Sequence, residues 1–217
     1  MIHDKETASN VANKLLEIKA VKLNPKNPYT WASGIISPIY CDNRKTLSFP
    51  EVRNYIKDSM AKIIKEKYSD VEVIAGVATG AIAIGVLVAE ALNLPFIYIR
   101  SSQKDHGLQN KIEGYYEQGQ KVVIIEDLIS TGMSSLAAYS ALKEANMVVE
   151  GMLAIYTYGL PIAKQQFEDA KCELTTLTDY DTTISVAVSK SYVDTEETET
   201  LKEWRKDPAN WHNSTTN

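Results

Sequence analysis

Two adjacent carboxylates followed by small hydroxyl-bearing residues form the stretch of this sequence best suited to chemistry. In VVIIEDLISTGMSS, residues 122–135, Glu126 and Asp127 close an apolar run, and a Ser/Thr/Gly segment follows them. Burying neighbouring carboxylates without partners is costly, so hydroxyls, a cation or a phosphate must lie nearby. A helix that starts just after Gly132 offers unpaired N–H groups to an anion. A phosphorylated ribose satisfies both halves, with its diol on the acids and its phosphate on the loop.

A plainer interpretation of the same stretch is also open. Ser130 or Thr131 could be an ordinary helix N-cap, with both acids facing water. The sequence contains neither GxxxxGK[ST] nor GxGxxG, so this is not a Walker loop or a dinucleotide loop. The acid pair directly before the loop favours the phosphate-binding interpretation.

Apolar strand-like stretches alternate with helical patterns from residue 71 onward. Strands are predicted at 71–76, 95–100, 121–127, 148–158 and 172–177, and helices at 80–93, 133–145, 161–171 and 179–190. This alternation predicts an α/β fold whose mainly parallel sheet is flanked by helices. Ligands of such sheets bind beyond the carboxyl ends of the strands. The loops after Ala75, Arg100 and Asp127 are therefore expected to carry the site.

The rest of the chain frames this core without a linker that would divide it. Further helices are predicted at 3–19, 50–68 and 194–206, and residues 21–49 read as irregular because prolines and a glycine interrupt them. We expect a single domain over residues 1–217. It comprises an N-terminal cap at about 1–45, an α/β core at about 46–192, and a C-terminal helix and tail at 193–217.

Composition narrows the class of protein and its compartment. The net charge of -5 gives no field that attracts nucleic acid. The longest uncharged run, residues 73–89, is shorter than the roughly 20 apolar residues of a membrane helix, and the polar start lacks a signal-peptide core. Cys41 and Cys172 lie outside any CxxC, which favours free thiols. We expect a cytoplasmic protein with no nucleic-acid and no membrane partner.

The stretch 122–135 resembles the phosphoribosyl-pyrophosphate (PRPP) signature of type I phosphoribosyltransferases. The resemblance implies the fold of that family, in which a cap, or hood, covers the α/β core. It also implies that Glu126 and Asp127 contact the ribose hydroxyls and that residues 130–134 hold the 5′-phosphate. The PRPP-binding residues implied on this stretch are Glu126, Asp127, Leu128, Ile129, Ser130, Thr131, Gly132, Met133 and Ser134.

Two further stretches, TWASGIISPIYCDNR (30–44) and YIRSSQKDHGLQNKIEG (98–114), are similar to orotate phosphoribosyltransferases. That family transfers the phosphoribosyl group of PRPP to orotate, giving orotidine 5′-monophosphate and diphosphate in pyrimidine (UMP) biosynthesis. The resemblance implies Mg²⁺ held mainly through PRPP and water. It also implies a homodimer in which the lid residues Arg100, Lys104 and His106 act on the partner's diphosphate. The catalytic residues implied are Lys104, His106 and Asp127.

This chain departs from many relatives at cationic positions. Ile36 and Ser101 stand where lysines occur in relatives, and no arginine lies near Thr157 to hold the orotate carboxylate. Arg44, with Ser130, is the remaining candidate for binding orotate, although Arg44 could equally pin the cap to the sheet. Two alternatives stay open: a phosphoribosyltransferase for another base, and a PRPP-sensing regulator without turnover. The cations Lys104 and His106 favour an enzyme.

Overall fold

A mainly parallel sheet forms the centre of the computed structural model, which describes residues 2–31, 33–100 and 111–211. The strand order is β10-β9-β8-β5-β6-β7, and only the β6–β7 pair is antiparallel. The predicted α/β fold with a mainly parallel sheet is therefore confirmed. The strands are β5 (Val73–Val77), β6 (Phe96–Ile99), β7 (Ile112–Glu113), β8 (Lys121–Ile129), β9 (Val148–Thr157) and β10 (Leu174–Asp179).

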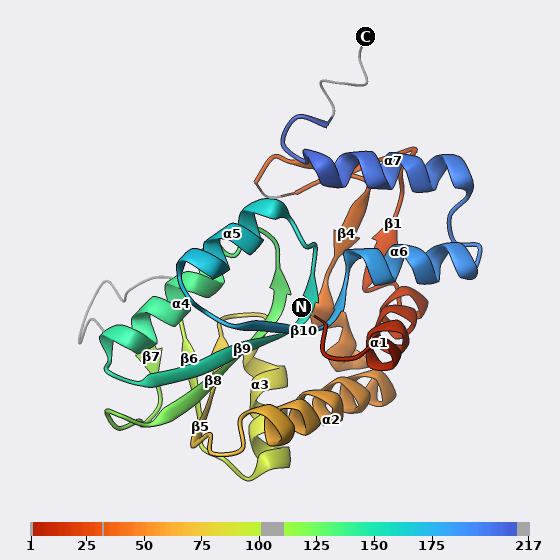
Figure 1. The fold of residues 1–217 in the computed structure, drawn as a ribbon. Coiled ribbons are helices and arrows are strands. Elements are labelled where there is room, and N and C mark those ends of the chain that lie inside the picture. The colour runs from red at the N-terminus through yellow and green to blue at the C-terminus, as the bar shows by residue number, and fades with distance from the viewer. Residues whose placement is uncertain (1, 32, 101–110, 212–217) are drawn as a thin grey trace.

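Helices cover both faces of the sheet, because each βαβ crossover places its helix on one side. Figure 1 shows α4 (Met133–Glu144) and α5 (Pro161–Asp169) on one face, and α2 (Pro50–Lys67) and α3 (Ile82–Leu92) on the other. Buried aliphatic side chains of β8 divide between two apolar clusters, one on each face. None of the helices within the described ranges is long and apolar enough to cross a membrane.

The strands differ from the sequence prediction at three places next to the loops expected to carry the site. β5 runs past Gly76 to Val77. Gly76 lies within the strand, and it is a glycine because of close packing. A β-carbon there would lie 2.9 Å from the carbonyl oxygen of Ala81 and from the Phe96 ring. β8 continues beyond Asp127 to Ile129, which pairs with Thr157 of β9. The segment between Arg100 and β8, expected to be a loop, contains the short strand β7, which pairs with β6.

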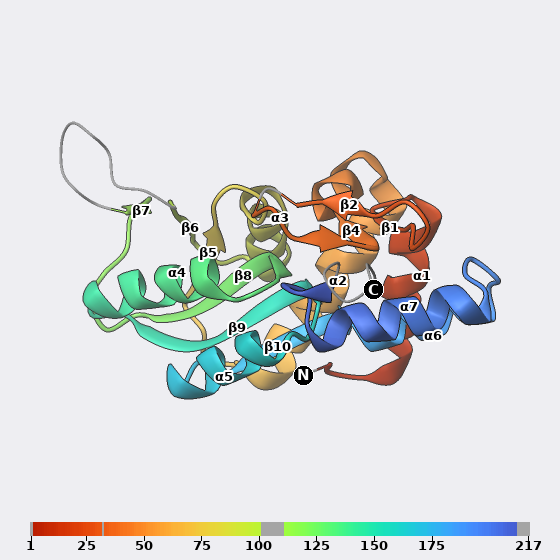
Figure 2. The ribbon, with the colours of Figure 1, turned by 90° about the horizontal axis from the view of Figure 1, so that it is seen from above.

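The residues before α2 form a cap beyond the carboxyl ends of the central strands. Two small antiparallel sheets replace the irregular segment expected there: β1 (Val21–Leu23) with β4 (Ile39–Cys41), and β2 (Tyr29–Thr30) with β3 (Ile36–Ser37). The short helix η1 (Asn43–Ser48) then leads into α2. Figure 2 shows β8 and β9 pointing toward these cap strands. The cap therefore lies over the sheet edge where ligands bind in this class of fold.

Three helices complete the structure around the cap. They are α1 (Lys5–Glu17), α6 (Tyr180–Ser189) and α7 (Thr195–Lys206). Asp4, Asp179 and Asp194 cap their first turns by accepting a backbone N–H bond, and Asp194 forms a capping box with Glu197. Buried residues of all three helices belong to the same apolar cluster as the cap residues Val21 and Ile39. The cap and the C-terminal helices therefore share one core.

Candidate active site

Asp127 lies where the loop after β5 meets the end of β8. A β-carbon built on Gly80 would lie 2.7 Å from Oδ1 of Asp127 and closer still to Oδ2. Only a glycine at residue 80 lets the carboxylate occupy this place. The Asp127 side chain is half-buried. The loop after β5 and the predicted sugar-binding acid therefore form one surface.

Glu126 has a different environment from its neighbour. It is 4% exposed, and its Oε2 accepts a hydrogen bond of 2.8 Å from the hydroxyl of Ser135 on α4. Its Oε1 accepts the backbone N–H of Asp127 at 2.9 Å. Burial, and then the neighbouring Asp127 carboxylate, raise the pKa of Glu126 well above its usual range. The adjacent acids are thus divided: Glu126 ties β8 to α4, and Asp127 lies at the open side of the loop.

The predicted phosphate loop, residues 130–134, ends in a helix start that carries no side-chain cap. The N-cap of α4 is Gly132, with φ of 88°, and among the described residues no side chain bonds the first turn as a cap. The alternative in which Ser130 or Thr131 is the N-cap is therefore not what the structure has. Met133 and Ser134 of this first turn are exposed. Unpaired N–H groups and the helix dipole make this turn suited to an anion.

The cap contacts the acid pair through a residue that the sequence did not reveal. Asn43 is 2% exposed, and its Nδ2 donates a hydrogen bond to the backbone carbonyl of Asp127. Its Oδ1 lies 3.4 Å from the thiol of Cys41. Asn43 and Ser135 hold the acid pair although neither was predicted as a site residue, because their contribution depends on tertiary contacts. No spacing in the sequence would have identified them.

Arg100 and Ser134 line one small cavity. Its volume is about 70 Å³, and Ala78 of the β5–α3 loop and Lys111 also line it. The Arg100 side chain lies 3.4 Å from Glu113, and its backbone N–H bonds the carbonyl of Lys111. Arg100 is thus placed beside the phosphate loop of its own chain. Lys104 and His106, the other predicted lid residues, lie outside the described residues.

Arg44, the candidate for binding orotate, is in an ion pair. Its Nε lies 2.7 Å from Oδ1 of Asp42, and its second guanidinium nitrogen lies 3.0 Å from Oδ2. The Arg44 side chain is 62% exposed. Its guanidinium holds the pKa of Asp42 below its usual range and also senses the charge of Asp127. Arg44 therefore lies on the cap next to Asn43, which bonds the Asp127 carbonyl, and Asp42 holds its guanidinium.

A larger hollow, of about 940 Å³, lies elsewhere on the molecule. It is bounded by α5, β10 and the N-terminal residues Ile2 and His3, and none of the described residues predicted for the site lines it. Its apolar floor and paired charges do not present the acids or the helix start described above. In the described parts of the chain, no group of three or more His, Cys, Asp or Glu side chains is placed to hold a metal ion.

Comparison with known proteins gives consistent results at the level of family, sequence and fold. A model of the phosphoribosyl transferase domain matches residues 48–178. The chain is 57% identical to an orotate phosphoribosyltransferase of Bacteroides fragilis, over 92% of this chain and 94% of that protein. It is also 57% identical to one of Porphyromonas gingivalis, over 93% and 96%. The orotate phosphoribosyltransferase structure from Aeropyrum pernix shares the fold, with a TM-score of 0.73, 22% identity, and coverage of 85% of this chain and 99% of that one.

Proposed function

This chain belongs to the orotate phosphoribosyltransferases of the phosphoribosyl transferase domain family. From that membership we infer which residues of the site bind each part of the two substrates. The enzyme transfers the phosphoribosyl group of PRPP to orotate, giving orotidine 5′-monophosphate and diphosphate in pyrimidine biosynthesis. The observation that carries the site assignment is the placement of Asp127, held against Gly80, beside the uncapped first turn of α4.

The ribose 5-phosphate half of PRPP is assigned to β8 and α4. The 5′-phosphate would accept hydrogen bonds from the backbone and hydroxyls of residues 130–134, where Gly132 permits close approach. Asp127 would accept a ribose hydroxyl in a charge-assisted hydrogen bond. Glu126 is proposed as the second acid of the diol contact. Its oxygens accept bonds from Ser135 and from the Asp127 N–H.

The diphosphate half is assigned to the loops after β5 and β6. Gly80 lies against the Asp127 carboxylate, and Arg100 lines a small cavity together with Ser134, which supports this placement. We propose a homodimer in which Arg100, Lys104 and His106 act on the partner's diphosphate. Because Arg100 also lies beside Ser134 of its own chain, an own-subunit role competes for that residue.

Magnesium is proposed to enter with the substrate, held mainly by diphosphate oxygens and water. Glu126 is buried with both oxygens hydrogen-bonded, whereas Asp127 is half-buried, so Asp127 is the better-placed outer partner for such an ion. When bound, the ion would neutralise charge on the diphosphate. Removal of divalent cations with EDTA should abolish turnover, and Mg²⁺ should restore it.

Catalysis by this site would rest on positioning and charge rather than on a nucleophilic side chain. As diphosphate leaves, positive charge builds on the ribose ring, as in glycosyl transfer generally. The carboxylate of Asp127 would stabilise that charge through the ribose, and lid cations, with Lys104 foremost, would stabilise the departing diphosphate. His106 would donate a hydrogen bond or a proton there.

Orotate is assigned to the cap side of the site. Residues 34–44 lie on the cap, and Asn43 of this segment bonds the Asp127 carbonyl, so a base held here would lie near the ribose. Arg44 and Ser130 are the proposed orotate-binding residues. The free, buried thiols of Cys41 and Cys172 agree with a reducing compartment, and we place the enzyme in the cytoplasm.

A panel of bases tests the proposed function directly. Purified protein would be incubated with PRPP and Mg²⁺ and with orotate, uracil, adenine or hypoxanthine in turn. We expect nucleotide and diphosphate to form with orotate alone. Turnover of another base would overturn the assignment of orotate. Calorimetric binding of PRPP without turnover of any base would instead identify a regulator.

A further inference from the structure

The C-terminal helix α7 packs on the cap at the proposed base side of the site. The residues matched by the family domain are 48–178, so the cap and α7 both lie outside the part that the whole family shares. They nevertheless contact each other through Trp204, which has no exposed surface. Elements that vary around a common core are suited to set which base is accepted.

Trp204 joins the cap to the end of β9. Its indole Nε1 donates a hydrogen bond of 3.0 Å to the carbonyl of Ile36 in the cap. Its ring meets Trp31 and Tyr158 edge-on, at centroid distances of 5.6 and 5.9 Å. Trp31 and Tyr158 are themselves 4.8 Å apart. One buried side chain of α7 therefore contacts both the cap and the residue that follows β9.

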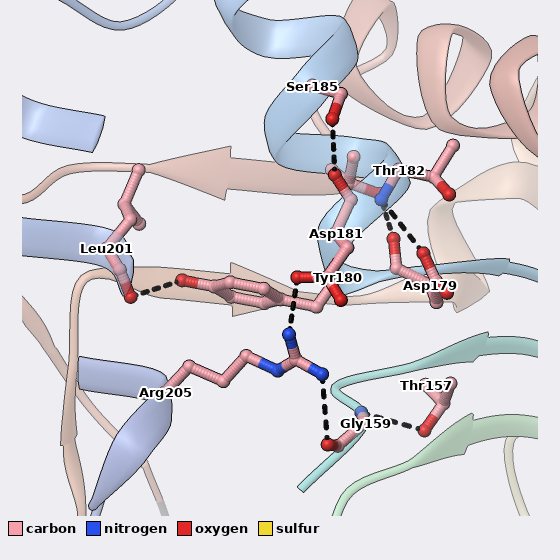
Figure 3. A network of polar contacts seen from close by, with 10 residues as sticks. Thr157, Gly159, Asp179, Tyr180, Asp181, Thr182, Ser185, Leu201 and Arg205 are labelled. Carbon is pink, nitrogen blue, oxygen red and sulfur yellow. Dashed lines mark hydrogen bonds and ion pairs between the residues drawn. The ribbon is translucent and has the colours of Figure 1, made fainter. Parts of the chain in front are cut away.

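Arg205, the next residue of α7, holds the same loop by a polar contact. Its guanidinium donates to the carbonyl of Gly159 at 3.3 Å and forms an ion pair with Asp181 of α6 (Figure 3). The guanidinium also lies over the ring of Tyr180, 5.5 Å from its centroid. Gly159 has φ of +61°, and the hydroxyl of Thr157 accepts its N–H. The loop after β9 is therefore fixed from both of its ends.

The loop that α7 holds adjoins the proposed substrate site. The backbone N–H of Tyr158 donates to the carbonyl of Ile129, the residue directly before Ser130. Ile36, held by Trp204, lies within the cap segment to which orotate is assigned. Ile129 is among the residues implied for PRPP binding, but only its main-chain carbonyl bonds Tyr158, and neither contact involves Asp127, Gly80 or the first turn of α4. Displacement of α7 should therefore disturb the base side more than the PRPP side.

We propose that Trp204 and Arg205 are positioning residues for the base: they fix the cap at Ile36 and the Tyr158–Gly159 loop relative to each other, and so determine affinity for orotate. The proposal rests on the assignment of orotate to the cap side. It concerns positioning only, because neither side chain is assigned a contact with substrate.

Two variants test it with kinetics in which both substrates are varied. Trp204→Phe keeps an aromatic ring but removes the N–H that bonds Ile36, and Arg205→Gln removes the ion pair and weakens the bond to Gly159. Loss of a buried hydrogen bond should raise the KM for orotate about fivefold. The KM for PRPP should stay within about twofold of the parent. Lys202→Gln, on the exposed surface of α7, serves as the matched control.

The outcomes separate this proposal from the proposed function. Equal increases in both KM values, or a lower melting temperature with both KM values unchanged, would show a purely structural role and overturn the inference. If Trp204→Phe does not fold, the KM values of Arg205→Gln test the proposal. The Arg205 side chain is partly exposed, so this variant should fold. A parent enzyme that uses another base would overturn the assignment of orotate. The same KM comparison would then be made with that base.

Discussion

The α-carbon of Gly80 lies against the carboxylate of Asp127, so closely that no larger residue at position 80 leaves the acid in place. Gly80→Ala should therefore push the Asp127 side chain away from the proposed ribose site. We expect the KM for PRPP to rise about tenfold, since a charge-assisted hydrogen bond is lost. A double-mutant cycle checks the cause. The Gly80→Ala/Asp127→Ala enzyme should be no worse than Asp127→Ala alone, and additive effects would contradict the coupling.

Asp127→Ala alone should leave the protein folded and weaken PRPP binding. The ribose hydroxyl would lose an ionised acceptor, a loss of about 1.5–3 kcal/mol. Calorimetric titration with PRPP measures the affinity, and circular dichroism checks the fold. Glu144→Gln, on the exposed face of α4, is the control. An affinity equal to that of the parent would remove Asp127 from the site.

The buried carboxyl of Glu126 should make the protein less stable as pH rises. Burial raises the pKa of Glu126 in the folded protein above its value in the unfolded chain. The stability that this carboxyl contributes is therefore fully present below the unfolded pKa, and it is lost as pH rises through the folded pKa. The contribution of Glu126 to the unfolding free energy should thus decline from about pH 4 upward. Glu126→Gln, which cannot ionise, should show a smaller decline.

Urea unfolding at several pH values measures this difference. Ser135→Ala is a useful companion, because it removes the hydroxyl that bonds Oε2 of Glu126 while leaving the carboxyl buried. It should lower stability most at high pH, where the carboxylate most needs that donor. Parallel pH profiles for the parent and Glu126→Gln would show that the Glu126 carboxyl titrates alike in both states of the chain.

The sequence was sufficient to predict the fold class, because apolar strands and helical stripes are local patterns. The run 122–125 is apolar on both faces, as a central parallel strand requires, and it indeed forms the middle of β8. The position of the acid pair on that strand followed from the same pattern. The different environments of Glu126 and Asp127 did not, because they depend on Ser135 and Gly80, which other elements supply.

The cap was the least predictable part. Its strands are only two or three residues long, too short for an alternating pattern to appear between prolines and glycines. Asn43, which bonds the Asp127 carbonyl, stands beside the conspicuous Arg44 and gives no signal of burial. The loop expected after Ala75 begins later in the structure, because a glycine required by close packing, as Gly76 is, looks the same in a sequence as one required by a turn.

The exposure of Arg44 favours a role in binding orotate over a role in pinning the cap to the sheet. Its side chain is 62% exposed, and exposed ion pairs such as the one with Asp42 contribute only about 0–1 kcal/mol to stability. We therefore expect Arg44→Ala to keep its melting temperature and to raise the KM for orotate about tenfold, with little change for PRPP. Asp42→Asn, which leaves the guanidinium in place, is the matched control. A destabilised Arg44→Ala enzyme with both KM values raised would favour the structural role.

The shared-site prediction requires two inactive chains. Lys104→Ala removes the proposed lid cation, and Asp127→Ala removes the ribose acceptor. If the lid acts across a dimer, a mixed dimer has one site with both lesions and one with neither, so activity should return on subunit exchange to about a quarter of the parent's in an equal mixture. If the lid serves its own chain, every site keeps one lesion and no activity returns. Native mass spectrometry confirms that mixed dimers have formed.

The same exchange with Arg100→Ala in place of Lys104→Ala resolves the competing roles of Arg100. This residue lines a cavity with Ser134 of its own chain, so an own-subunit role would place the Arg100 and Asp127 lesions in different sites of the mixed dimer. Each site would then carry one lesion, and the mixture would stay inactive. Recovery with Lys104→Ala but not with Arg100→Ala would show that Arg100 acts at its own phosphate loop while Lys104 acts across the interface. Recovery with both would place Arg100 with the partner's diphosphate as well, and would require the Arg100 side chain to leave the cavity it shares with Ser134.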